Sequence, residues 1–101
     1  MVTTNPAERQ AHRQAALDKV DALLALFKQQ PTRTEIANLI ELGEHLHRAV
    51  QAFHLEAIRF RMYSMDRALT AAAPFMPDSA RTTFEQVRSE LEAAGFATRS
   101  H

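Results

Sequence analysis

The sequence of 101 residues has no cysteine, no tryptophan and no excess charge of either sign. Without cysteine the chain cannot form a disulfide scaffold, use thiol catalysis or bind a metal through thiolates. Twelve basic residues balance twelve acidic ones, which argues against nucleic acid or an anionic membrane as a partner, since both attract basic proteins. No apolar run approaches the ~20 residues of a membrane span, and the first residues do not open a signal peptide. We therefore expect a soluble, cytoplasmic protein.

Residues that break helices are also scarce, because the chain has only two glycines and four prolines. Pro6 suits the first turn of a helix, and Gly95 suits a left-handed C-cap. Pro31 and Pro74 are expected to end helices. These signals predict an all-α fold in a single domain, residues 1–101, with frayed termini at 1–4 and 97–101 and three helices at about 6–30, 34–72 and 78–94.

The very long central helix is the most informative of these predictions, because residues 34–72 contain no proline. About 39 residues of helix span roughly 58 Å, whereas a compact chain of this length has a diameter of about 34 Å. Shorter helices folded back along it would leave only two helices at each level, which cannot enclose a core. We therefore expect an antiparallel helical bundle completed by dimerisation, as a dimer or a tetramer. The alternative is a monomer in which this helix breaks at Gly43 and forms a four-helix bundle.

Beyond residue 53 the apolar arc of the central helix covers more than half of its circumference. Phe53, Ala57 and Phe60 lie on one side of this arc, which we assign to the third helix of the same chain. The other side is the predicted dimer interface, and it comprises Leu55, Ile58, Met62, Met65 and Leu69.

Two residues of the central helix form a pattern that binds metals in some helical bundles. Glu44 and His47 are spaced i, i+3, which places a carboxylate and an imidazole on one helical face. His54 follows one heptad later. A dimer would bring two such half-sites together. We expect no cofactor, and the alternative is a divalent metal held by Glu44, His47 and His54.

His47, His54 and Arg61 repeat at intervals of seven, so they lie along one edge of the apolar stripe. One interpretation is that they border a helix–helix interface and fix its register. The other is a pocket for an anion or a small carboxylate, with the arginine as the charge and the imidazoles as donors.

Other catalytic patterns are lacking in the sequence. Gly43 and Gly95 are isolated, so no glycine-rich loop could cradle a phosphate, and no serine stands in the context of a nucleophile elbow. We therefore expect a non-catalytic α-helical homodimer that acts as an interaction or regulatory module, with a protein as its further partner. The alternative is a metal-binding helical-bundle protein whose Glu-x-x-His half-site is completed across the dimer.

Overall fold

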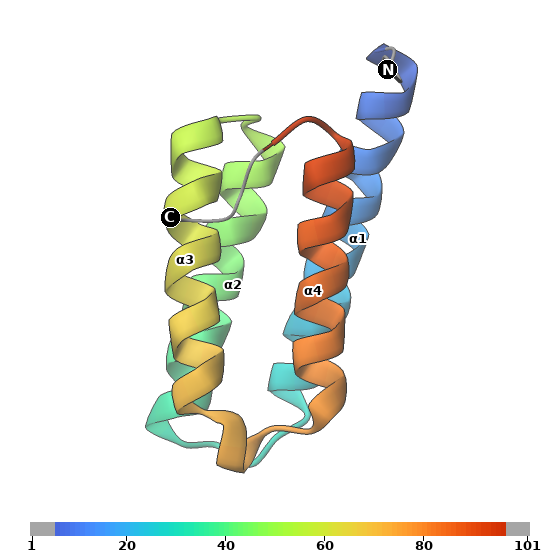
Figure 1. Ribbon diagram of the computed structural model, residues 1–101. Coiled ribbons are helices and arrows are strands. Elements are labelled where there is room, and N and C mark those ends of the chain that lie inside the picture. The colour runs from blue at the N-terminus through green and yellow to red at the C-terminus, as the bar shows by residue number, and fades with distance from the viewer. Residues whose placement is uncertain (1–5, 97–101) are drawn as a thin grey trace.

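The computed structural model describes residues 6–96, and this part of the chain is all-helical, with no strand. A 3-10 turn joins the last two of its α-helices, and successive helices run antiparallel in a bundle of 44 × 25 × 22 Å (Figure 1). The predicted all-α fold is confirmed, while the frayed termini predicted at 1–4 and 97–101 lie outside the described residues. The elements are α1 (Pro6–Lys28), α2 (Thr34–Gln51), α3 (Leu55–Ala71), η1 (Ala73–Phe75) and α4 (Asp78–Ala93).

The helices pack as two close pairs. α1 lies against α4, α2 lies against α3, and contacts between α1 and α2 join the two pairs. α3 and α4 touch each other little, and in Figure 1 they stand on opposite sides of the bundle's front face. α3 therefore has one close helical neighbour, α2, and much of its surface faces outward. None of the helices within residues 6–96 combines the length and the apolar character needed to cross a lipid bilayer.

The outer ends of the bundle agree with the sequence signals. Pro6 is the first residue of α1, and Gly95, which follows the C-cap residue of α4, has a φ of +100°. The N–H of Phe96 donates to the carbonyl of Leu91 at 2.9 Å. The N–H of Gly95 donates to the carbonyl of Glu92 at 3.0 Å. These two hydrogen bonds satisfy carbonyls at the end of α4 that have no partner within the helix.

The predicted central helix at 34–72 is wrong, because the chain turns at residues 52–54 and the antiparallel helices α2 and α3 replace it. The described residues therefore form four helices and not three. The break does not lie at Gly43 either, since this residue lies inside α2. A Cβ at Gly43 would come within 2.6 Å of the Leu24 side chain of α1. This glycine thus permits the close approach of two helices and does not end one.

The turn between α2 and α3 is built on a phenylalanine. Phe53 has a φ of 60°, a left-handed conformation that bulky residues rarely adopt. Its N–H donates to the carbonyl of Val50 at 3.1 Å, and the N–H of His54 donates to the carbonyl of Ala49 at 3.4 Å. The hydrogen-bond pattern is the same as at the end of α4, where a glycine occupies the left-handed position.

A single chain encloses its own core, because four helices surround it along most of the bundle. Ile58, Met62 and Met65 of α3 are fully buried in this core, and Leu69 is 4% exposed. Four of the five residues predicted for a dimer interface are therefore already covered within one chain. The fifth, Leu55, is 40% exposed at the start of α3. A second copy is not needed to close the core, and the homodimer itself stays a prediction.

Charged side chains join α3 to α4. Asp66 of α3 accepts a hydrogen bond from Arg81 of α4 at 2.7 Å and lies 3.8 Å from Arg88. Arg88 is buried, and the guanidinium groups of Arg81 and Arg88 lie 5.5 and 5.2 Å from the ring centre of Phe84. The contacts of Asp66 with Arg81 and Arg88 thus link α3 to α4, while the cation–π contacts lie within α4 and help to position its two arginines.

Candidate interaction surface

The structure separates the residues predicted to hold a metal. Nε2 of His47 in α2 lies 3.2 Å from Oδ1 of Asp21 in α1, and Glu44 is exposed one turn earlier. His54 lies beyond the end of α2, where its Nδ1 accepts a hydrogen bond from the N–H of Ala57 at 3.2 Å and caps α3. Within residues 6–96, no three His, Cys, Asp or Glu side chains gather into a group that could hold a metal ion.

The predicted edge of His47, His54 and Arg61 is interrupted for the same reason. Intervals of seven place residues on one helical face only while the helix continues, and α2 ends at Gln51. His47 contacts α1, and His54 caps the start of α3. The guanidinium carbon of Arg61 lies 5.0 Å from the ring centre of Phe60. The three side chains therefore make three separate local contacts.

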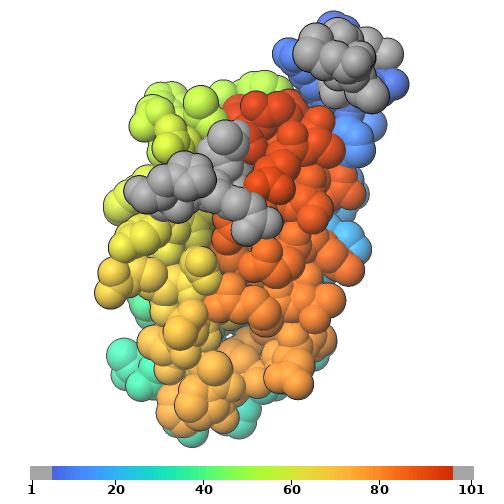
Figure 2. Space-filling view, in the orientation of Figure 1, coloured from blue at the N-terminus to red at the C-terminus, as the bar shows by residue number. Residues whose placement is uncertain are grey.

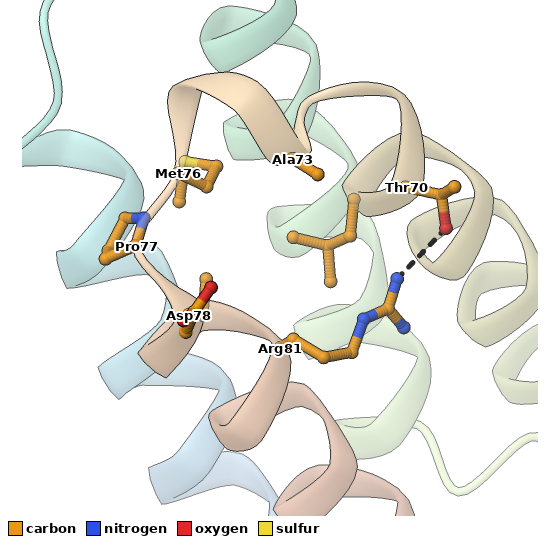
Figure 3. A pocket seen from close by; sticks show the side chains of 8 residues that line it. Thr70, Ala73, Met76, Pro77, Asp78 and Arg81 are labelled. Atoms are coloured by element: carbon orange, nitrogen blue, oxygen red, sulfur yellow. Dashed lines mark hydrogen bonds between the residues drawn. The ribbon is translucent and has the colours of Figure 1, made fainter.

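A cavity of about 320 Å³ lies where α3, η1 and α4 meet (Figure 3). Arg81 borders it, but this side chain donates to the hydroxyl of Thr70 at 3.1 Å and to Asp66 at 2.7 Å. The Thr70 hydroxyl and the Arg81 guanidinium thus bind each other, and no nucleophile stands beside a base among the lining residues. The cavity offers no catalytic arrangement. The rest of the lining is Leu69, Ala73, Met76, Pro77, Asp78 and Ala80.

Large apolar side chains are exposed mainly in one short segment. Within residues 6–96, five such side chains are at least 36% exposed, and four of them lie between residues 53 and 63. Phe53 and Leu55 lie at the turn before α3. Phe60, at 58%, and Tyr63, at 46%, are the most exposed and lie on α3 itself. Figure 2 shows α3, in yellow and yellow-green, along the edge of the molecule beside α4 in orange.

Phe60 and Tyr63 belong to a stripe directly opposite the buried face of α3. Glu56, Phe60, Tyr63 and Arg67 are all exposed, and we call these four residues the outer stripe. Their spacing of four, three and four residues repeats that of the buried residues of α3, which start two positions later at Ile58. At 100° per residue the two stripes lie on opposite faces of the helix. α3 therefore has a buried apolar face and, opposite to it, an exposed face with two aromatic rings between two charged residues.

Arginines lie against both rings of the outer stripe. The guanidinium of Arg61 lies 5.0 Å from the ring centre of Phe60, and that of Arg67 lies 5.7 Å from the ring centre of Tyr63. Nη1 of Arg67 also donates to the Tyr63 hydroxyl at 2.9 Å. This hydrogen bond, together with the Coulombic interaction with Tyr63, raises the pKa of Arg67, so the guanidinium keeps its charge. The surface thus combines aromatic area with a fixed positive charge.

The sides predicted from the sequence are reversed for Phe60, Met62 and Met65. Phe60 is exposed, although it was assigned to contact with the chain's own third helix, and Met62 and Met65 are buried, although they were assigned to a second copy. The sequence feature that distinguishes the exposed stripe from the buried one is the type of residue at the two ends of each stripe. The outer stripe begins with Glu56 and ends with Arg67, whereas the buried stripe is apolar throughout.

Comparison with known proteins gives no match, since no family model, no curated protein and no solved structure matches the chain.

Proposed function

We propose that the protein is a non-catalytic interaction module whose contact surface is the outer stripe of α3. The observation that carries this proposal is the exposure of Phe60 and Tyr63 side by side on a helix whose opposite face fills the core. The homodimer predicted from the sequence remains part of the proposal, but its surface moves from the buried stripe to the outer stripe.

The composition of the outer stripe supports a role in protein binding. Aromatic residues and arginine are enriched at protein interfaces, where aromatic rings contribute much contact area for little loss of conformational entropy. A single exposed apolar residue needs no explanation. Two exposed rings with arginines against them form a continuous surface that a partner can cover.

Site-specific photo-crosslinking in the producing cell tests this proposal without knowledge of the partner. Tyr63 is replaced by benzoylphenylalanine, which keeps an aromatic ring at the position, and irradiation traps whatever lies against α3. The control is the same replacement at Gln86, an exposed residue of α4. We expect a discrete adduct from position 63 and none from position 86. No adduct from position 63, or equal adducts from both positions, would overturn the proposal.

A further inference from the structure

We propose that the outer stripe binds a second copy of this chain, with the two α3 helices antiparallel across a two-fold axis at the level between residues 61 and 62. This inference rests on the proposed function and names its partner. A two-fold interface brings the same surface of both copies together, so the surface must be complementary to itself. The order of residues along the outer stripe meets this condition.

The stripe has opposite charges at its two ends and aromatic rings between them. Glu56 and Arg67 have their midpoint between residues 61 and 62, and Phe60 and Tyr63 have the same midpoint. Antiparallel packing about that point therefore aligns both pairs at once. Each Glu56 lies level with the partner's Arg67, and each Phe60 lies level with the partner's Tyr63. Aromatic rings pack in the centre, and an ion pair closes each end.

Both terminal charges remain able to bind across the interface. Arg67 uses one N–H on the Tyr63 hydroxyl, and a guanidinium has five such donors. Glu56 lies 3.7 Å from Arg59, which is a long contact between two exposed side chains and therefore a weak one. A carboxylate of this kind can accept a further hydrogen bond from a second arginine.

The charge order also selects the antiparallel arrangement over the parallel one. In a parallel pair in the same register, Glu56 would face Glu56 and Arg67 would face Arg67, and like charges in direct opposition repel. In the antiparallel pair Arg59 lies level with the partner's Ser64, which is uncharged. The arrangement that aligns the rings is thus the one that pairs the charges.

Charge exchange tests the inference with purified full-length protein. We expect sedimentation equilibrium to show a concentration-dependent dimer of the wild type, since interfaces of one helix per copy are small. Glu56→Arg and Arg67→Glu should each raise the Kd for self-association about tenfold, which corresponds to about 1.4 kcal/mol. An equimolar mixture of these two variants should form heterodimers with near wild-type affinity, because each end of the pair then holds opposite charges.

The controls keep the outcomes distinct. The double variant Glu56→Arg with Arg67→Glu should also recover self-association, and Glu35→Arg, an equal change of charge at the start of α2, should leave the Kd unchanged. Circular dichroism checks that each variant is folded. A wild-type dimer without recovery in the mixture would overturn the antiparallel register. A wild-type monomer at about 1 mM would overturn the inference and the homodimer. The proposal that the outer stripe is a contact surface would still stand if position 63 traps a different protein.

Discussion

Phe53 holds the turn between α2 and α3 in a conformation that costs free energy. A residue with a Cβ is roughly 1–2 kcal/mol less stable in the left-handed region, and the φ of Phe53 is 60°. The Phe53 ring meets the ring of Phe96 edge-on, with 4.8 Å between centroids, and the guanidinium of Arg13 lies 5.0 Å from its centre. Arg13 also donates to the carbonyl of Gln51 at 3.3 Å, at the end of α2 where the helix dipole favours positive charge. Contacts from α1 and from the end of α4 thus offset the strain.

Two substitutions at residue 53 separate the backbone strain from the ring contacts. Phe53→Ala removes the ring but leaves a Cβ in the left-handed conformation, whereas Phe53→Gly removes both the ring and the strain. We expect both variants to be less stable than the wild type, and the glycine variant to retain about 1 kcal/mol more free energy of unfolding than the alanine variant. Urea denaturation followed by circular dichroism measures this difference. An alanine variant as stable as the glycine variant would contradict a left-handed residue 53.

At the scale of the elements, the sequence predicted the helix ends that proline and glycine mark. α1 begins at Pro6 and α4 ends before Gly95, because a missing N–H and a tolerance of positive φ are properties of the residue itself. The turn at residues 52–54 has no such marker. The side chains that contact it, Arg13 and Phe96, are distant in the sequence. Helix propensity and periodicity describe only neighbouring residues and therefore cannot predict such contacts.

The candidate surface could be predicted only in part, for the same reason. The apolar arc predicted beyond residue 53 included Phe60, which is exposed, and Met62 and Met65, which are buried. Which of them is buried depends on where the other three helices lie after the turn. The predictions of a metal site and of a polar edge built on the histidines were wrong for a related reason. Both placed residues 44–61 on one continuous helix, and the chain turns within this range.

Gly43 and Leu24 test how closely α1 and α2 approach each other. A Cβ at Gly43 would lie 2.6 Å from Cδ2 and 3.2 Å from Cγ of Leu24, so the whole side chain would have to move. Gly43→Ala gains about 1 kcal/mol in helix propensity, but overpacking costs about 1–3 kcal/mol, and we expect a net loss of about 1 kcal/mol. In a Leu24→Ala background the same substitution should stabilise the protein by about 1 kcal/mol. Chemical denaturation of the four proteins measures both effects, and the same sign in both backgrounds would refute the close contact.

At the scale of the whole molecule, the chain fits a long apolar segment into a small volume by turning. A continuous helix over residues 34–72 would span about 58 Å, whereas the longest dimension of the bundle is 44 Å. The turn lets both halves of this segment pack against each other, with α1 and α4 completing the enclosure. Folding of the core thus needs only one chain, and self-association through the outer stripe is added to a structure that is already closed.

Substitution by glutamate on each of the two faces of α3 tests which face is buried and which is exposed. Met65→Glu places an unpaired carboxylate at a fully buried position, at a cost of several kcal/mol against a total stability of about 5–15 kcal/mol. We expect the Tm to fall by more than ~15 °C, or the cooperative transition to disappear. Phe60→Glu, at a position that is 58% exposed, should shift the Tm by only a few degrees. Thermal melts followed by circular dichroism compare the two, and a larger effect at residue 60 would reverse the orientation of α3.

The contacts that fix the α2–α3 turn also have a kinetic consequence. Phe53 lies in the middle of the chain, but its ring is held by Arg13 near one end and Phe96 near the other. The long chain segments between Phe53 and these two residues lose conformational entropy when their ends come together, and the contacts compensate for this loss only after they form. We therefore expect the ring contacts of Phe53 to form late in folding. Because interactions that form after the rate-limiting step mainly slow unfolding, we expect loss of the Phe53 ring to speed the unfolding of the bundle more than it slows its folding.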